Sequence, residues 1–401
     1  MKNRNIGFLS IATLLSLSLW FSASAVIPQL TTEWSLSSTA QAWMTMSVQI
    51  GFVFGALISA ILNLADKYPA PKLIAISALF GAVVNALIPL LSTGPESAIT
   101  FRFLTGASMA GVYPPAMKII ASWCTKDRGK FIGLLVGAVV IGSGMPHLLN
   151  ALSSGSSGIP SWRIVLYGTS IQAALGALIA WFWIKSGPHL GKASRFDWKH
   201  AASGLTDKAT RLANFGYFGH MWELYAMWAW VPIMLLVSYK NAGLPEYMAR
   251  YAAFGMFLAG GIGSYVAGIW ADKIGRTTIT SIALGISGAC CLLVGFFFDQ
   301  PIILTVVCLI WGIAVIADSA QFSAAVSELA DSSYVGTALQ VQTSLGFLIT
   351  LVTLQAMPLL IDTIGHEYAY LLLIPGPIFG IISMLKLKRR PESAQMAFGN
   401  R

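Results

Sequence analysis

The sequence predicts an all-α integral membrane protein, with twelve transmembrane helices in two six-helix bundles related by pseudo-two-fold symmetry. Three observations support this fold class: the composition, the number of long apolar segments and the placement of the basic residues. Of the 401 residues, 56% are hydrophobic and only 10% are charged, whereas an ordinary soluble domain carries roughly 25% charged residues. A chain of this composition has too little polar surface to fold as a soluble protein.

Long apolar segments recur throughout the chain. A span needs about 20 apolar residues to cross a hydrocarbon core of roughly 30 Å. The expected spans are 7–30, 40–63, 72–92, 98–123, 130–151, 162–184, 212–238, 247–270, 277–297, 301–324, 335–358 and 367–385. The one long connection is polar and basic, and it divides the chain into a bundle over 1–184, a linker over 185–211, a bundle over 212–390 and a tail over 391–401.

Basic residues gather at one set of helix ends. Most of the 25 Lys and Arg residues fall in the termini, the linker and the short loops that share their side, whereas the opposite side holds only Arg163, Lys240 and Arg250. An excess of Lys and Arg in short loops marks the cytoplasmic side of a membrane protein. Both termini are therefore expected in the cytoplasm. Because this pattern accounts for the net charge of +9, nucleic acid is not an expected partner.

Several function classes lack their characteristic residues in this sequence. The four cysteines lie in or beside apolar segments without metal-ligand spacing, and the five histidines are scattered along the chain. No Gly-Lys-Ser/Thr loop is available to cradle the phosphates of ATP. The sequence therefore predicts neither an enzyme nor a metal or cofactor site, and it gives no support to an ATP-driven pump.

A short motif is repeated in the two halves. Asp66 and Lys67 follow an alanine at the end of the second span, and Asp272 and Lys273 follow an alanine at the end of the eighth. The copies lie about half the chain apart, at the same place in each set of six spans. Parallel six-helix repeats of this kind are typical of one large class of secondary transporters.

The second copy resembles the loop motif of the major facilitator superfamily, which runs Gly-x-x-x-Asp-Arg/Lys-x-Gly-Arg/Lys. Gly268, Asp272, Lys273, Gly275 and Arg276 match every position. The resemblance extends over essentially the whole chain. It implies a secondary transporter without a cofactor, whose two bundles rock about a central solute site.

We expect these loops to form a latch between the bundles, in which a carboxylate pairs with basic side chains or with a helix N-terminus. The first copy is incomplete, because Leu62 and Ala70 replace its two glycines. The alternative is a simple turn whose charges are solvated. The expected latch residues are Asp66, Lys67, Gly268, Asp272, Lys273, Gly275, Arg276 and, from the loop after the fourth span, Arg128.

Two further segments carry a resemblance. Glycines of the fifth span, with Pro146, are similar to the antiporter motif of exporters in this family, but Met145 interrupts its Gly-Pro step. Small residues at helix contacts would give the same pattern. The segment around His220 and Glu223 is loosely similar to a bacterial subgroup of nitrate/nitrite and organic-anion porters, which implies the inner membrane of a bacterium. Nitrate itself is not expected, because the second span offers only Gln49 where nitrate porters carry an arginine.

Ionisable side chains within the spans are the candidates for coupling transport to protons, because each costs a few kcal/mol or more at the bilayer centre. Glu223 and His220 lie one turn apart on the seventh span, and Asp318 lies in the tenth. A carboxyl group withdrawn from water can gain and lose a proton near neutral pH. The alternatives are a buried structural hydrogen bond between helices and, for Asp318, a partner for the latch.

The solute site is expected near the middle of the membrane, between the bundles. Pro114 and Pro115 should bend the fourth span there and allow a cavity. The candidate ligands are polar, basic or aromatic side chains within the spans: Arg102, Gln49, Tyr113, Trp20, Trp222, Tyr225, Trp230, Gln321 and Gln342. For the aromatic residues, a place in the helix core or against lipid is the alternative, and Arg102 can instead bond backbone carbonyl groups.

The sequence thus predicts a secondary active transporter that moves a small organic solute, anionic or amphiphilic in character, by alternating access with proton coupling. A proton-driven efflux antiporter for drugs or metabolites is the alternative within this class. A non-transporting membrane receptor or scaffold is the alternative of another class. The expected partners are the solute, protons and the lipid bilayer, and the expected oligomeric state is a monomer.

Overall fold

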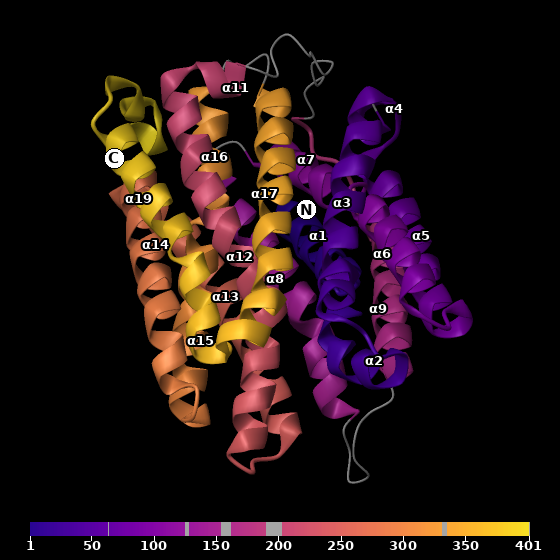
Figure 1. Ribbon diagram of the computed structural model, residues 1–401. Coiled ribbons are helices and arrows are strands. Elements are labelled where there is room, and N and C mark those ends of the chain that lie inside the picture. The colour runs from indigo at the N-terminus through magenta and orange to yellow at the C-terminus, as the bar shows by residue number, and fades with distance from the viewer. Residues whose placement is uncertain (63, 125–127, 154–161, 190–202, 331–334, 401) are drawn as a thin grey trace.

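The computed structural model describes residues 1–62, 64–124, 128–153, 162–189, 203–330 and 335–400. Helices of the N-terminal half, from indigo to magenta, lie beside those of the C-terminal half, from pink to yellow (Figure 1). The N-terminal half contains α1 (Lys2–Leu17), η1 (Ser24–Val26), α2 (Ile27–Trp34), α3 (Ser38–Ile61), α4 (Leu64–Lys67), α5 (Ala70–Leu91), α6 (Pro95–Met109), α7 (Tyr113–Trp123), α8 (Arg128–Leu152) and α9 (Trp162–Trp183). The C-terminal half contains α11 (Ser203–Thr206), α12 (Lys208–Asn241), α13 (Glu246–Ile274), α14 (Arg276–Leu293), η2 (Val294–Phe297), α15 (Pro301–Ala317), α16 (Ser319–Leu329), α17 (Val335–Ile364), α18 (His366–Ala369), η3 (Tyr370–Leu373), α19 (Pro375–Lys388), η4 (Pro391–Gln395) and η5 (Ala397–Gly399).

Ten helices of the described residues are long and apolar enough to cross a membrane. The other two predicted spans, 7–30 and 98–123, are each interrupted, the first between α1 and α2 and the second between α6 and α7. In the second case α7 carries Pro114 and Pro115 in its first turn, where the N–H group that proline lacks is not needed to continue the helix. The predicted bend of the fourth span is therefore confirmed.

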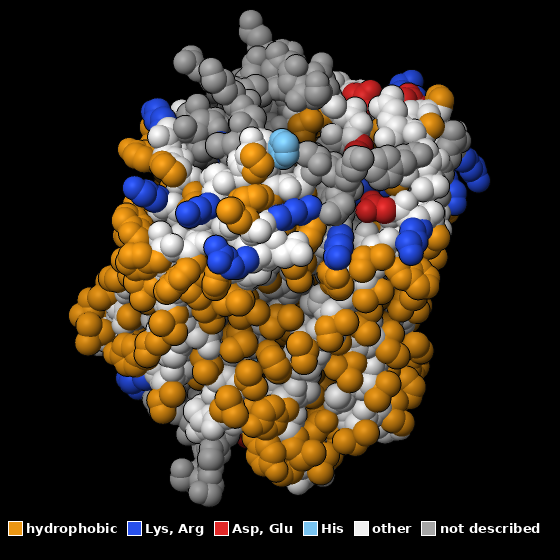
Figure 2. Space-filling view, turned by 180° about the vertical axis from the view of Figure 1, so that it is seen from behind, with side chains coloured by type: hydrophobic (Ala, Val, Ile, Leu, Met, Phe, Trp, Pro, Cys, Tyr) orange, Lys and Arg blue, Asp and Glu red, His pale blue; other side chains and the backbone are white. Residues whose placement is uncertain are grey.

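A broad band of hydrophobic side chains covers the middle of the face seen in Figure 2, with Lys and Arg gathered along its upper edge. Large apolar side chains exposed on the molecule include Leu79, Ile171, Phe182 and Ile310. An apolar surface of this extent is unusual for a soluble protein, whereas in a bilayer it meets lipid chains of similar polarity. The structure is that of a multi-pass membrane protein.

Two helix pairs make the most extensive contacts between the halves among the described residues: α8 packs against α13, and α3 packs against α17. Glycines allow the first pair to approach closely, because a Cβ added to Gly137 would lie 2.6 Å from the carbonyl oxygen of Gly261. In the same seam, the Ser264 hydroxyl donates to the carbonyl oxygen of Gly133 at 3.3 Å. Gly133 and Gly137, two glycines of the fifth span, therefore lie at a close helix contact, as the packing interpretation expects.

We call the end of the molecule that carries α4, α11 and the C-terminal tail the linker end, and the end that carries α2 and the turn between α12 and α13 the distal end (Figure 1). At the distal end, Glu33 accepts hydrogen bonds from Arg163 at 2.9 Å and from Trp162 at 2.5 Å. The Arg163 bond, followed by the Trp162 bond, holds the pKa of Glu33 below its ordinary value of 4.5. These contacts tie the first span of the N-terminal half to its sixth.

Replacing Glu33 with Gln is expected to lower the free energy of unfolding at neutral pH by less than about 1 kcal/mol, because the ion pair is half exposed and screened by solvent. In the wild type this contribution is fully present above pH 4.5 and is lost as the pH falls through the lowered pKa of the folded state. Thermal unfolding in detergent as a function of pH measures the effect. The two proteins should converge in acid, and a difference that persists there would contradict the ion-pair explanation.

Candidate functional site

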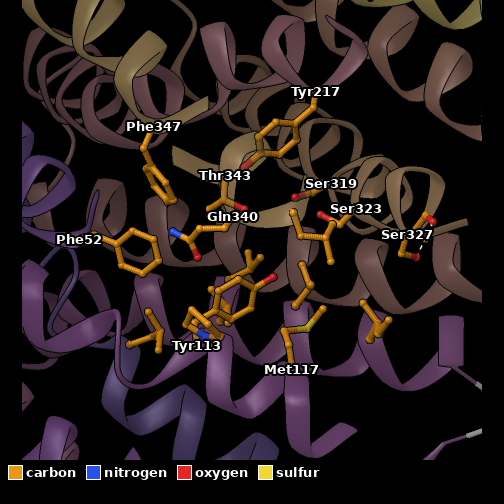
Figure 3. Close-up of a pocket in the computed structure, with 18 of the residues that line it drawn as sticks. Phe52, Tyr113, Met117, Tyr217, Ser319, Ser323, Ser327, Gln340, Thr343 and Phe347 are labelled. Atoms are coloured by element: carbon orange, nitrogen blue, oxygen red, sulfur yellow. Dashed lines mark hydrogen bonds between the residues drawn. The ribbon is translucent and has the colours of Figure 1, made fainter. Parts of the chain in front are cut away.

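A cavity of about 640 Å³ lies between the two halves, a volume within the range of small-molecule sites. In Figure 3, Phe52, Tyr113 and Met117 of the N-terminal half point toward Tyr217 and Phe347 of the C-terminal half. The polar and charged side chains in its described lining include Tyr113, Lys118, Ser122, Ser143, His189, Tyr217, Tyr225, Ser319, Ser323, Ser327, Gln340 and Thr343. This described lining contains no Asp or Glu.

Breaks in two helices bring hydroxyl groups to the cavity. After the break in the fourth span α7 begins at Tyr113, and after the break in the tenth span α16 begins at Ser319. The broken helices are the fourth and the tenth spans, which occupy corresponding places in the two halves. Ser319, Ser323 and Ser327 follow one another at intervals of four residues, so they share one face of α16, and this face lines the cavity.

Aromatic rings close the cavity toward the distal end. The ring of Trp20 lies 5.3 Å from that of Phe52 and 5.9 Å from that of Tyr225, and Phe52 lies 4.8 Å from Phe347. Trp20 and Phe52 belong to the N-terminal half, whereas Tyr225 and Phe347 belong to the C-terminal half. The closure is thus made by contacts between the halves.

Two polar contacts also join α3 to α17. The Thr350 hydroxyl donates to the side chain of Gln49, and the Ser38 hydroxyl donates to the carboxylate of Asp362. Ser38 begins α3 and Asp362 lies near the end of α17, so this second contact is at the distal tip of the seam. Both contacts must break if the halves separate at this end.

At the linker end the lining includes Lys118 and Ser327, together with the exposed residues His189 and Gly336. The cavity therefore reaches the surface at the linker end, while aromatic rings seal it toward the distal end. This is the arrangement of a site that is open to one side of a membrane.

Three of the predicted solute ligands, Trp20, Tyr113 and Tyr225, line the cavity. Those that lie outside its described lining are Arg102, Gln49, Trp222, Trp230, Gln321 and Gln342. The lining residues that were not among the predicted ligands include Phe52, Lys118, His189, Tyr217, Ser319, Ser323, Gln340, Thr343 and Phe347. For the serines a signal was present, since their regular spacing places them on one face of a helix.

The predicted ligands outside the cavity have other contacts. Trp222 donates to the carbonyl oxygen of Leu372 at 2.9 Å, and Gln321 accepts a hydrogen bond from Arg276 at 2.7 Å. Trp230 and Gln342 are almost fully buried without lining the cavity. For Trp222 and Trp230, these positions are those of the core alternative.

Arg102 is fully buried and stabilises the break in the first span. Its Nη1 donates to the carbonyl oxygen of Leu19 at 2.8 Å and to the hydroxyl of Ser22 at 2.9 Å, and its Nη2 donates to the carbonyl oxygen of Trp20. Its Nε donates to the carbonyl oxygen of Met44 at 3.3 Å. Carbonyl groups at a helix end lack intrahelical partners, and Arg102 satisfies them. The carbonyl-bonding alternative is the one observed.

Glu223 is fully buried within the C-terminal half. One carboxylate oxygen accepts from the indole N–H of Trp311 at 2.5 Å, and the other accepts from the Ser287 hydroxyl at 3.0 Å. The Cys291 thiol lies 3.5 Å from the first oxygen. Because these partners come from α14 and α15, Glu223 joins three helices of one half and is absent from the described lining of the cavity.

His220 and Asp318 form a second buried cluster. The Nδ1 atom of His220 lies 2.9 Å from Oδ1 of Asp318, and both side chains are almost completely inaccessible to solvent. The contact lacks the angles of a good hydrogen bond, and within the described part of the chain His220 Nε2 and Asp318 Oδ2 have no hydrogen-bond partner. The sequence placed both residues among the proton candidates but did not pair them.

Arg276 is the centre of the predicted latch. Its Nε and Nη2 donate to Glu328 at 2.7 and 2.6 Å, its Nη1 donates to Gln321 at 2.7 Å, and Nη2 lies 3.2 Å from Asp272. Asp272 in turn lies over the start of α8, where a Cβ added to Gly129 would be 2.7 Å from its carboxylate. A carboxylate is stabilised at a helix N-terminus, so Asp272 joins the two halves at the linker end.

The glycines of the motif have separate structural reasons. Gly275 adopts φ +96° between α13 and α14, a conformation that side chains with a Cβ rarely adopt. Gly268 allows α13 to approach α8, since a Cβ there would be 3.0 Å from a backbone oxygen. Of the other predicted latch residues, Lys67 and Lys273 are exposed, and the side chains of Asp66 and Arg128 lie outside the described residues.

The sequence model of the Major Facilitator Superfamily matches residues 9–354. The chain belongs to this family. A solved structure of a D-xylose-proton symporter is similar to it with a TM-score of 0.75 over 97% of this chain and 98% of that one, at 16% identity. The predicted fold, an all-α membrane protein of twelve helices in two bundles, is thereby confirmed.

Relatives of this chain are transporters. It is 30% identical over 155 residues to the 4-hydroxybenzoate transporter of Pseudomonas aeruginosa, covering 38% of this chain and 32% of that protein. It is 27% identical over 266 residues to the fujikurins efflux protein of Gibberella fujikuroi, covering 63% of this chain and 52% of that protein. The matches thus span about a third and about a half of the relatives' own lengths. Family and relatives together identify a membrane transporter.

Proposed function

We propose that this protein is a secondary active transporter that moves a small amphiphilic organic anion by alternating access and couples its movement to protons. The cavity between the halves carries the proposal, because it is lined from both halves, sealed toward the distal end and open at the linker end. The gathering of basic residues supports a cytoplasmic location for the linker end. The structure is then an inward-facing state in the inner membrane of a bacterium.

The lining supports an anion with an apolar body. Lys118 and His189 are basic, the described lining contains no carboxylate, and hydroxyl groups of Tyr217 and Thr343 lie beside each other in Figure 3. Aromatic rings at the floor offer flat apolar surfaces on which a ring can stack. A hydroxylated aromatic carboxylate combines these features, and a relative named for 4-hydroxybenzoate transport supports this class.

The latch supports the rocking of the halves. In the observed state Asp272 lies against the start of α8 and Arg276 holds Glu328. When the linker end closes, the seam between α3 and α17 must open distally, and Gln49 and Thr350 must separate. Alternating access of this kind moves one bundle against the other around a fixed central site.

Efflux, the direction opposite to uptake, is the second candidate. The likeness to the fujikurins efflux protein covers more of this chain than the likeness to the 4-hydroxybenzoate transporter, and it favours a proton-driven efflux antiporter. The two directions use the same cavity and the same alternating states. They differ in whether protons and solute move together or in exchange.

Purified protein in liposomes is expected to take up labelled 4-hydroxybenzoate in preference to benzyl alcohol or benzylamine, with an acid exterior driving accumulation. Replacing Lys118 with Gln should raise the KM for the anion about tenfold or more, because a charge-assisted hydrogen bond contributes about 1.5–3 kcal/mol. The measurement is the initial rate of uptake against solute concentration, with and without the pH gradient.

The matched control is Lys240→Gln, which removes an exposed lysine from the distal end of α12, outside the cavity. Its KM should equal that of the wild type. Preference for benzylamine over 4-hydroxybenzoate would contradict the proposed solute class. Movement of the anion out of vesicles in exchange for entering protons would replace the symporter with the antiporter.

A further inference from the structure

We infer that the transported proton is carried by the His220–Asp318 pair, while Glu223 keeps one protonation state throughout the cycle. The inference rests on the proposed function and deepens it by naming the coupling residues. The sequence favoured Glu223 as the proton carrier, with His220 assisting. The unused hydrogen-bonding capacity of the pair distinguishes it from Glu223, and its position beside the cavity and its charge relative to the solute suit the role.

The pair lies one side chain behind the wall of the cavity. Asp318 is the residue at the α15–α16 break, immediately before Ser319, whose side chain lines the cavity. On α12, His220 is preceded by the lining residue Tyr217, three positions earlier, and followed directly by Met221. A small movement of either wall residue would bring water from the cavity to the pair.

The pair also has hydrogen-bonding capacity that nothing else uses. Both carboxylate oxygens of Asp318 and both ring nitrogens of His220 lack a properly angled hydrogen-bond partner in the part of the chain described here. Buried polar groups in proteins are nearly always hydrogen-bonded to protein or water. The 2.9 Å contact between Nδ1 and Oδ1 therefore leaves positions at which a proton or a water molecule can be accepted.

Glu223 also lies beside the cavity wall, since Leu224 and Tyr225 follow it directly and line the cavity, but it differs in its hydrogen bonding. Each of its oxygens accepts from a fixed donor, Trp311 or Ser287, and these donors belong to the same half of the protein. The acceptor positions of Glu223 are thus already occupied, whereas those of the pair are open to a proton or a water molecule.

Charge links the pair to the proposed solute. With one proton the pair is neutral as a unit, whether as imidazolium and carboxylate or as imidazole and carboxylic acid; without it the unit carries one negative charge. An anion in the cavity is repelled by the negative unit, so anion binding and protonation favour each other. In a medium of low dielectric constant this interaction is worth on the order of tenfold in affinity or more.

The proton balance needs no further reactant. The pair takes one proton from a hydronium ion in the cavity when the site is open to the acid side, and it returns that proton to water on the other side. The titratable and charged groups nearest to the pair are Tyr217 and Glu223 of α12, Cys291 of α14 beside Glu223, and Arg276, which Gln321 separates from the pair. Glu328 balances the charge of Arg276.

The test compares Asp318→Asn with Glu223→Gln, which alters the other buried carboxylate of the same half. For each protein, exchange of labelled for unlabelled 4-hydroxybenzoate at equal pH is measured beside accumulation driven by an acid exterior. Asp318→Asn is expected to retain exchange within about threefold of wild type while losing accumulation, because an amide cannot carry the proton. Glu223→Gln is expected to retain both.

A second readout separates coupling from structure. Quenching of tryptophan fluorescence reports anion binding, since Trp20 and Trp228 line the cavity. Wild-type affinity should weaken as the pH rises, and in Asp318→Asn this dependence should disappear; His220→Gln provides a second variant if Asp318→Asn does not fold. If wild type moves no anion, the proposed function fails. If wild type accumulates the anion and Asp318→Asn does so equally, or Glu223→Gln alone loses accumulation, only the assignment of the proton to the pair is overturned.

Discussion

The double variant Ser38→Cys/Asp362→Cys is expected to stop transporting once a disulfide joins its two introduced thiols. The two wild-type side chains are hydrogen-bonded at the distal tips of α3 and α17, which belong to different halves. Joining them holds the halves together where they must separate. An intact disulfide keeps its two Cα atoms within about 4.4–6.8 Å of each other, so the distal ends of α3 and α17 cannot separate while the bond is present.

The measurement is uptake into liposomes before oxidation, after oxidation and after reduction. Oxidation should abolish uptake in the double variant only, and a reductant should restore it. Each single-cysteine variant is a matched control, and the four native cysteines are buried, so the oxidant reaches the introduced pair first. Unchanged transport in a protein whose cross-link is complete would contradict alternating access between these halves.

The membrane spans could be predicted because the bilayer sets their length. A run of about 20 apolar residues is long enough to cross the hydrocarbon core, and the repeated Asp-Lys motif placed the same loop in each half. The breaks in the first and fourth spans were harder to foresee. Hydropathy is the same for a continuous helix and for two helices in line, and only Pro114 and Pro115 gave a local signal.

The rotation of each helix about its axis could not be predicted from composition. In a soluble helix the polar face marks the solvent side, but here the lipid face and the core face are both apolar. The sequence therefore treated Tyr225 and Trp222 alike, although the first lines the cavity and the second packs against α19 and its preceding turn. The contact between His220 and Asp318 depends on the packing of α12 against α16, which the sequence does not reveal.

The latch shows which residues a local motif can predict. The motif identified Asp272 and Arg276 and explains the glycine at φ +96°. It did not identify Glu328, which makes the shortest contact with Arg276 and lies on another span. A local pattern specifies the residues of one loop, whereas the partners of these residues depend on tertiary packing.

Arg102→Leu is expected to lower the free energy of unfolding by at least about 3 kcal/mol, because several buried acceptors lose a charged donor and each buried unsatisfied group costs about 1–3 kcal/mol. Three of these acceptors lie at the break of the first span, the carbonyl oxygens of Leu19 and Trp20 and the hydroxyl oxygen of Ser22, and the fourth is the carbonyl oxygen of Met44 in α3. Water cannot reach them, since the guanidinium is fully buried. Arg102→Lys should be intermediate, because a single ammonium group cannot span acceptors that a planar guanidinium reaches in several directions.

The control for this prediction is Arg163→Leu, which removes a half-exposed arginine from an ion pair at the distal end and should cost less than about 1 kcal/mol. Thermal unfolding in detergent, together with the yield of folded protein, measures both. The experiment also decides between the two interpretations that the sequence allowed for Arg102. An unfolding temperature equal to that of Arg163→Leu, with loss of anion binding, would assign Arg102 to the solute site; a large loss of stability assigns it to the break in the first span, where its side chain replaces the missing donors of the helix.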